Sequence, residues 1–256
     1  MGNDFCHLHC HSTYSLLDGI IKVADLPGRV KDLGMSACAL TDHGNLHGML
    51  DFYKECKKGG IKPIIGIECY ITVDPDGVDE DYKKTRDNHH CILIAQSNEG
   101  LSNLFWLLTN GNLNNFYYKP RINIETLKTR SNGLICTSAC VGGLVAQQGT
   151  FDSEKKVFLD PEAKAYRAAK DLQEVFGNKF YLEIQDQDMW EQTAFNKFLL
   201  DLSKKEKIPL VITADAHYLK EEDKGTHAMI MAQQLKKTIH EYESGSEMKY
   251  GGGFYI

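Results

Sequence analysis

The amino-acid sequence predicts an α/β barrel in which seven strands alternate with helices. Short apolar runs alternate along the chain with longer segments of helical spacing. The 256 residues are enough for one barrel, and the 42% of apolar and 25% of charged residues are typical of a globular domain. Because repeated strand–helix units favour a parallel sheet covered by helices, we expect one barrel rather than two domains.

Seven runs have the length and apolar content of buried strands. They are Phe5 to Cys10, Met35 to Thr41, Ile61 to Tyr70, Cys91 to Gln96, Leu134 to Thr137, Phe180 to Gln185 and Leu210 to Thr213. Five further segments have the spacing of helices. They are Val23 to Leu33, Leu46 to Lys58, Leu101 to Leu108, Pro161 to Phe176 and Met189 to Lys205. Helices therefore separate most of the strands.

Two stretches interrupt the alternation. Val73 to Asn88 is polar and acidic, and Thr109 to Arg121 reads TNGNLNNFYYKPR. Clusters of Asn, Gly, Pro and Asp mark turns and loops, so we expect both stretches to be exposed loops.

The segment after the last strand begins with acidic residues at Glu221 and is expected to remain helical to about Tyr242. The ending KYGGGFYI has the character of a connector that is cut short. We expect a single domain over residues 1–256, with a barrel core over about 4–217 and a C-terminal helix and truncated connector over about 221–256.

The composition excludes several classes of protein. The chain contains no run of eighteen apolar residues and its start lacks the features of a signal peptide, so we expect a cytoplasmic protein with no membrane partner. Several of the eight cysteines lie in apolar, strand-like runs, which favours buried reduced thiols, one of them available as a ligand. A net charge of −6 argues against a domain that binds a nucleic-acid backbone unaided, although bound divalent ions would reverse the local charge.

Side chains that bind metals follow the predicted strands. The relevant stretches are HLHCHS, TDHG, GIECY, SAC and TADAH. In a parallel barrel the carboxyl ends of the strands meet on one face, so these side chains are expected to meet there. Residues two apart on a strand point to the same side, as do His9 with His11 and Asp215 with His217. More than four such groups indicate more than one ion.

Each motif alone has an ordinary structural interpretation. His7 has the same parity as His9 and His11, so spacing does not choose the ligand pair. Asp42 before His43-Gly44 is suited to capping a helix, and Cys140 is by default a small buried apolar residue. Glu68 is harder to explain in this way, because a buried carboxylate needs a metal or cationic partner.

Seven ordered blocks make the chain resemble the PHP (polymerase and histidinol phosphatase) domain that begins the alpha subunit of the bacterial or phage replicative DNA polymerase III. The blocks are HLHCHSTYSLLDG, MSACALTDHGNLHGMLDFY, GIKPIIGIECY, HHCILIAQSNEGLSNL, FYYKPRI, GLICTSACVGG and IPLVITADAHYL. The resemblance implies a distorted (β/α)7 barrel with two or three divalent metal ions and nine ligands. The expected ions are Zn²⁺, Mn²⁺ or Fe, and a cysteine ligand favours Zn²⁺.

Residue by residue, the resemblance assigns all nine ligand positions. They correspond to His9, His11, Asp18, His43, Glu68, His90, Cys140, Asp215 and His217. The family suggests one division of these ligands among three ions. His9, His11 and Asp215 bind the first ion, His90 and Cys140 bind the second, and Glu68 is shared between these two. Asp18, His43 and His217 bind the third. The residues expected to serve catalysis are Asp18, His43, Glu68, Asp215 and His217.

The resemblance further implies a metal-dependent phosphoesterase, specifically a 3′ to 5′ exonuclease for proofreading in DNA replication. The expected substrate is a single-stranded DNA 3′ end, and the expected partners are the remaining polymerase domains or other replisome subunits. Tyr117, Tyr118, Lys119 and Arg121 are possible DNA contacts, with aromatic faces for bases and cations for phosphates, or else part of a solvated loop with packed tyrosines.

Two other functions remain compatible with the sequence. The same ligands would serve a stand-alone phosphomonoesterase of the histidinol-phosphatase type. Alternatively, metals would only stabilise a docking module of the polymerase. The barrel accounts for the whole length of 256 residues, so we expect no polymerase active site within this chain.

Overall fold

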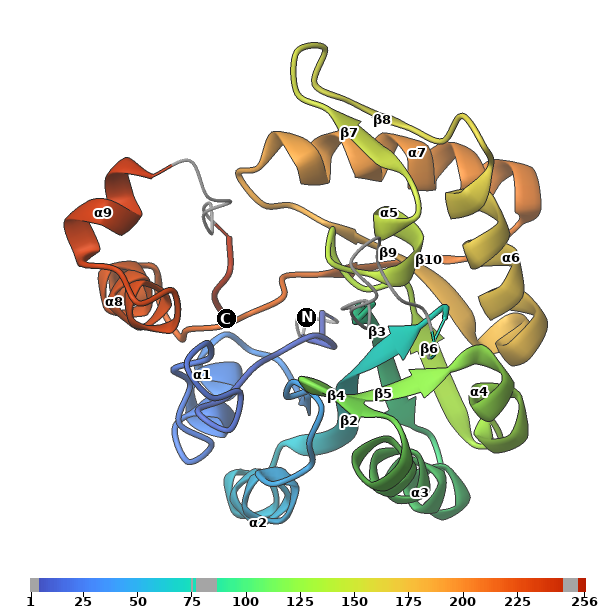
Figure 1. Cartoon of the computed structure of the whole chain (residues 1–256). Helices are drawn as coiled ribbons and strands as arrows, with labels where there is room; N and C mark the ends of the chain where they lie inside the picture. The colour runs from blue at the N-terminus through green and yellow to red at the C-terminus, as the bar shows by residue number, and fades with distance from the viewer. Residues whose placement is uncertain (1–4, 75, 77–86, 246–252) are drawn as a thin grey trace. The chain divides into compact units, whose positions relative to one another are not determined.

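The computed structural model describes residues 5–74, 76, 87–245 and 253–256 (Figure 1). Contacts divide the chain into two compact units. The first comprises residues 1–65, 185–189 and 213–256, and the second comprises residues 66–184 and 190–212. Both contain helices and strands, which confirms the mixed α/β class. No helix among the described residues is long and apolar enough to cross a membrane.

The first unit consists mainly of helices around one parallel strand pair. Its elements are α1 (Leu26–Asp32), β1 (Ala37–Leu40), α2 (Met49–Gly59), the 3-10 helix η2 (Glu221–Asp223), α8 (Lys224–Gln234) and α9 (Ile239–Ser244). Strand β1 pairs in parallel with the first residues of β2 (Lys62–Thr72). Helix α2 is followed by Gly60, whose φ of 73° is a left-handed conformation that costs glycine little. The apolar core of the first unit includes Cys10, Ile21, Leu26 and Phe52.

The second unit contains the larger part of the sheet, in the order β10-β9-β6-β3-β2-β5-β4. Its further strands are β3 (His89–Ala95), β4 (Phe116–Tyr117), β5 (Lys119–Asn123), β6 (Leu134–Thr137), β9 (Phe180–Gln185) and β10 (Leu210–Thr213). Its helices are α3 (Asn98–Asn114), α4 (Ile124–Arg130), α5 (Leu144–Gln147), α6 (Lys164–Phe176), η1 (Gly177–Lys179) and α7 (Trp190–Glu206). A separate hairpin joins β7 (Thr150–Asp152) to β8 (Val157–Leu159).

Strand β3 runs antiparallel to both of its neighbours, β2 and β6, so the prediction of an all-parallel sheet is wrong at this strand. The pairs β2–β5 and β6–β9 are parallel, as expected. A parallel crossover usually needs a helix, and the polar sequence from residue 73 to 88 has no helical pattern. The reversal places the first residues of β3 beside the last residues of β2, with His90 opposite Tyr70.

Tertiary contacts also change two other predicted elements. Residues 5–10 form no strand, because their backbone pairing is limited to isolated contacts such as the bridge between Cys10 and Ala216. The predicted loop from Thr109 to Arg121 is instead the end of α3 followed by the β4–β5 hairpin. Gly111 lies so close to the hairpin that an added Cβ would be 3.1 Å from the Arg121 carbonyl oxygen, which shows that packing outweighs the low helix propensity of this stretch.

The C-terminal segment is helical, but its helix is not continuous. Helix α8 ends at Gln234, Lys236 takes a left-handed φ of 56°, and α9 starts with a capping box in which the side chains of Thr238 and Glu241 exchange hydrogen bonds with the backbone. The predicted connector lies partly outside the described residues. Its last residues pair with the segment after β10, through a bridge between Tyr218 and Tyr255.

Candidate metal centre

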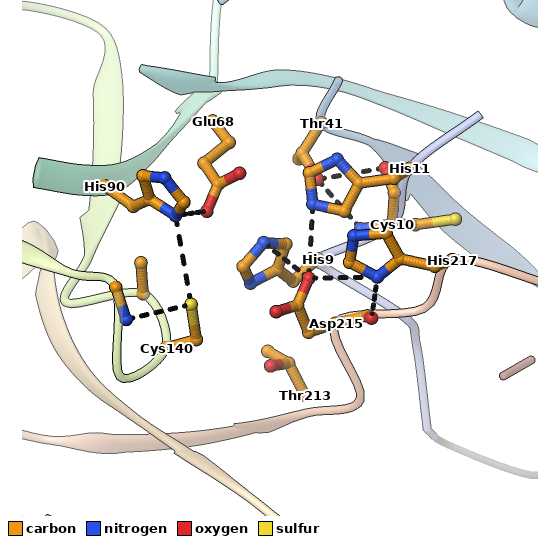
Figure 2. A network of polar contacts seen from close by, with 12 residues as sticks. His9, Cys10, His11, Thr41, Glu68, His90, Cys140, Thr213, Asp215 and His217 are labelled. Atoms are coloured by element: carbon orange, nitrogen blue, oxygen red, sulfur yellow. Dashed lines mark hydrogen bonds and ion pairs between the residues drawn. The ribbon is translucent and has the colours of Figure 1, made fainter. Parts of the chain in front are cut away.

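His9, His11 and Asp215 form a buried group of metal-binding side chains in the first unit (Figure 2). The Nε2 atoms of His9 and His11 lie 3.0 and 3.2 Å from the same oxygen, Asp215 Oδ1. Their ligand atoms lie within 4.8 Å of one another. Two imidazole nitrogens and one carboxylate are a usual donor set for Zn²⁺, Mn²⁺ or Fe.

The backbone brings these three side chains together. The amide of His11 donates to the Ala216 carbonyl at 2.8 Å, and the amide of Ala216 donates to the His9 carbonyl at 3.1 Å. Asp215 itself has a left-handed φ of 51°, which is uncommon for a residue with a side chain and typical of functional sites. Gln185 Nε2 lies 3.5 Å from His9 Nδ1 and 3.3 Å from Thr213 Oγ1. It therefore contacts the ring nitrogen of His9 that does not face Asp215.

The charge of Asp215 is maintained by its neighbours. Burial alone would raise the pKa of this carboxyl, but the nearby imidazoles of His9, His217 and His11 outweigh burial and lower its pKa below the usual range. The carboxylate is therefore ionised at neutral pH, which is the state that binds a cation.

Asp18, His43 and His217 form a second group in the same unit. His43 Nε2 lies 2.9 Å from Asp18 Oδ2, and His217 Nε2 lies 3.4 Å from Asp18 Oδ1. The ring of His11 stacks on both His43 and His217, with centroid distances of 4.1 and 4.4 Å, and the ligand atoms of these three histidines lie within 4.8 Å of one another. Burial would raise the pKa of Asp18, yet His217 and other imidazoles beside it hold that pKa well below its usual range.

Asp42 supports this group from outside. Its Oδ1 accepts hydrogen bonds from the Ser12 amide and the Ser15 hydroxyl, both at 2.7 Å, and its Oδ2 accepts one from the Ser12 hydroxyl at 2.8 Å. Ser15 Oγ in turn lies 3.1 Å from His11 Nδ1 and accepts from the His43 amide at 3.1 Å. The interpretation of Asp42 as a helix cap is wrong, because α2 begins after Gly48 with no side-chain cap.

Glu68, His90 and Cys140 form a third group, in the second unit (Figure 2). His90 Nδ1 lies 2.8 Å from Glu68 Oε1 and 3.9 Å from Cys140 Sγ. The antiparallel direction of β3 explains why a histidine at the start of a strand lies beside a glutamate near the end of another. Gly142 leaves room for the ring of His90, since a Cβ at position 142 would be 3.0 Å from His90 Nδ1.

Left-handed backbone conformations occur at or directly before three of the predicted ligands. Eight non-glycine residues of the described chain have positive φ, and they include Leu17 before Asp18, Ala139 before Cys140, and Asp215 itself. Such conformations cost free energy and persist where function requires a particular side-chain direction.

His7 has the parity of the ligand pair but a different environment. Its ring packs edge-to-face on Phe5 at a centroid distance of 4.9 Å, and burial, with the charge of Arg29, lowers its pKa to about 4. None of the metal-binding groups found among the described residues includes His7. The tertiary structure therefore favours His9 and His11 as the pair, which spacing left open.

The four possible DNA contacts lie on the β4–β5 hairpin of the second unit. Tyr118 is 57% exposed at the turn, and Lys119 Nζ lies 5.1 Å from the ring centroid of Tyr70. Arg121 is fully buried, donates to the Asn115 carbonyl at 3.2 Å and packs its guanidinium on the Tyr117 ring. The burial of its guanidinium makes Arg121 the least accessible of the four residues, and DNA contacts through this hairpin stay a prediction.

Replacing Arg121 with methionine is therefore expected to lower the free energy of unfolding by about 2–3 kcal/mol, because it removes a buried charged hydrogen bond and leaves its acceptor unsatisfied. Lys119→Met on the same hairpin is the control and should change stability by less than about 0.5 kcal/mol. Urea unfolding monitored by circular dichroism measures both. Equal stability of the two variants would contradict the structural role of Arg121.

Sequence reasoning missed the supporting residues of the centre. Gln185 and Ser15 belong to no metal motif, and Asp42 was assigned to a helix cap. His227, a buried histidine on α8, is a further omission: its Nε2 lies 3.6 Å from Asp18 Oδ1. The only signal for His227 in the sequence was a histidine inside a helical pattern, which usually indicates core packing.

Comparisons with known proteins agree with the geometry. The family model described as "PHP domain" matches residues 7–187. The DNA polymerase III subunit alpha of Aquifex aeolicus is 42% identical over 251 residues, which cover 96% of this chain and 21% of that protein. The same subunit of Helicobacter pylori strain 26695 is 39% identical over 241 residues, covering 93% of this chain and 20% of that protein. The chain thus spans about a fifth of the length of these relatives.

One solved structure shares the fold at low sequence identity. It belongs to a Bifidobacterium adolescentis protein thought to be a metal-dependent phosphoesterase, and it aligns with a TM-score of 0.54 at 12% identity. The alignment covers 84% of this chain and 88% of that one.

Proposed function

Because this chain belongs to the PHP domain family, which its match over residues 7–187 shows, we propose that it is a metal-dependent phosphoesterase that removes nucleotides from DNA 3′ ends. The observation that supports the proposal best is the complete donor set. All nine expected positions carry a histidine, carboxylate or thiol, and these side chains gather in three groups. A complete donor set is what catalysis through bound metal ions would require.

The donors suit divalent metal ions. His9, His11 and Asp215 would bind one ion, Asp18, His43 and His217 another, and Glu68, His90 and Cys140 would contribute the remaining ligands. Imidazole and carboxylate donors suit Zn²⁺, Mn²⁺ or Fe, and the thiolate of Cys140 favours Zn²⁺. We propose two or three ions in total.

Divalent ions bound there would lower the pKa of a coordinated water and neutralise charge on the phosphate oxygens. The residues of the chain supply orientation and proton transfer. Asp215 accepts two imidazole contacts on one oxygen and thus fixes the rings of His9 and His11. Asp18 or His217 would assist proton transfer only while its carboxylate oxygen or Nε2 is not bound to an ion, because a ligated group is a poor base; the two atoms lie 3.4 Å apart. The chain needs no nucleophile of its own.

The names of the relatives suggest the substrate and partners. Proteins called DNA polymerase III subunit alpha share the sequence of this chain over about a fifth of their length, so we propose that it works beside other polymerase domains or replisome subunits and acts in proofreading. Because the chain has a net charge of −6, the attraction for DNA would come from bound metal ions and from local cationic groups such as Lys119. A single-stranded 3′ end could stack a base on Tyr118.

The test is hydrolysis of a single-stranded oligonucleotide labelled at its 5′ end, with Mn²⁺ or Zn²⁺ added, in parallel with 4-nitrophenyl phosphate. We expect products that shorten stepwise from the 3′ end and that disappear in His9→Ala. His240→Ala, a change at an exposed histidine, is the control. Cleavage of 4-nitrophenyl phosphate alone would favour a phosphomonoesterase, and metal binding without any cleavage would favour a docking module.

A further inference from the structure

Three imidazoles, rather than the two expected, face the carboxylate of Asp18. His43 Nε2 lies 2.9 Å from Oδ2, whereas His217 Nε2 and His227 Nε2 lie 3.4 and 3.6 Å from Oδ1. His227 is the addition: it lies on α8, outside the residues matched by the family model, and the nine expected ligands do not include it. Only 2% of its surface is exposed.

We propose that His227 is a positioning residue for Asp18, which it holds through Nε2 so that the carboxylate binds a metal ion in one orientation. The proposal rests on the proposed function, because it assumes that Asp18 is a ligand. The separation of 3.6 Å is within ion-pair range and longer than a formed hydrogen bond, so the inference is that Nε2–H donates to Oδ1 when the carboxylate is drawn into its ligating position. Carboxylate ligands of metals are commonly held by such an outer donor.

The ring of His227 is fixed from two sides. It lies against the ring of Tyr218 with a centroid distance of 5.3 Å and a 38° tilt, and against His217 at 5.5 Å. Tyr218 is in turn held by the backbone bridge to Tyr255. Further along α8, Met231 and Ala232 pack in a small apolar cluster with Tyr242 of α9, which anchors the helix. A ring fixed in this way delivers its Nε2 to one place.

The two oxygens of the Asp18 carboxylate face different histidines. His43 faces Oδ2, and His217 and His227 share Oδ1. His43 and His217 are themselves expected ligands, so their nitrogens would be used to hold an ion. His227 is not an expected ligand, so it would remain beside Oδ1 and hold Asp18. Removal of His227 should therefore weaken the binding of an ion without removing any ligand.

The experiment measures metal binding instead of activity. Wild type, His227→Ala, His227→Gln and the exposed control His240→Ala are stripped of metal and titrated with Zn²⁺ against a chromophoric chelator, and the ions per chain are counted by mass spectrometry. We expect His227→Ala to bind one ion about 10–100-fold more weakly, as changes to outer-shell donors do. His227→Gln should bind within a few-fold of wild type, because its amide nitrogen can replace Nε2–H as a donor. His240→Ala should match wild type.

Each other outcome overturns the inference. Wild-type affinity in His227→Ala, with only a lower melting temperature of the metal-free protein, would make His227 a packing residue. Equal weakening in the Gln and Ala variants would make it a direct ligand. If the Ala variant does not fold, His227→Leu, which fills the space without a donor, replaces it: weaker binding of one ion in the Leu variant but not in the Gln variant supports the inference, and equal affinity in the two refutes it. A wild type that binds no metal at all would refute the proposed function, a result distinct from failure of His227 alone.

Discussion

Asp215→Asn is expected to lower the rate of phosphoester cleavage by at least about 100-fold, more than the loss of an outer-shell donor would, and to release one metal ion per chain. Oδ1 of Asp215 faces the Nε2 atoms of both His9 and His11, at 3.0 and 3.2 Å. Asparagine keeps the shape of the side chain but lacks the negative charge that offsets a cation. Its neutral amide is therefore a poor replacement at this position.

Asp215→Asn should leave the fold intact, because asparagine suits the backbone conformation at this position. An effect of the substitution on metal binding can therefore be distinguished from unfolding. Asp215 has a left-handed φ of 51°, a conformation that asparagine adopts more readily than most residues. Asp32→Asn, at an exposed position at the end of α1, is the matched control. Initial rates on the labelled oligonucleotide and ions per chain measure the effect. Full activity in Asp215→Asn would show that this group is not the catalytic one.

Removal of metal is expected to lower the melting temperature by about 5–10 °C. An ion present at 100 times its Kd stabilises the folded state by about 2.7 kcal/mol. For a chain of this length, each kcal/mol corresponds to about 2–4 °C. The physical reason is that ions draw together buried donors such as His9, His11 and Asp215, which the unfolded chain does not assemble.

Scanning calorimetry with and without a chelator measures this shift. Asp215→Asn is the internal reference, since a variant that has lost one ion should lose a smaller part of its stability on chelation. An unchanged melting temperature of the wild type, with metal shown to be bound beforehand, would contradict the coupling between metal and fold.

Local sequence patterns determined many elements of the fold. The predicted strands Leu134–Thr137, Phe180–Gln185 and Leu210–Thr213 have the bounds found in the structure, because short apolar runs between polar segments leave little choice. The same patterns did not predict features that depend on contacts with neighbouring strands and helices. The β3 strand has an ordinary apolar sequence, and nothing in that sequence reveals that it runs antiparallel to β2.

The nine candidate metal ligands also came from the sequence, through the resemblance of its ordered motifs to the PHP domain. Their assembly into groups, such as His9, His11 and Asp215, could be expected from strand ends but was demonstrated only in three dimensions. Candidate DNA contacts were harder to choose from the sequence. A basic residue in an aromatic stretch resembles a contact, and only packing shows that Arg121 is enclosed.

The sequence by itself therefore determined the α/β class, through local periodicity, and it determined the family and the nine candidate ligands, through the resemblance of its ordered motifs to the PHP domain. The tertiary structure decided the direction of β3, the different surroundings of His7 and His9, the burial of Arg121 and the place of His227 beside Asp18. The physical reason is that these four properties depend on contacts between residues far apart in the chain. A histidine on α8 acquires its role only when folding places it 3.6 Å from a carboxylate 209 positions earlier in the chain, the difference between 227 and 18.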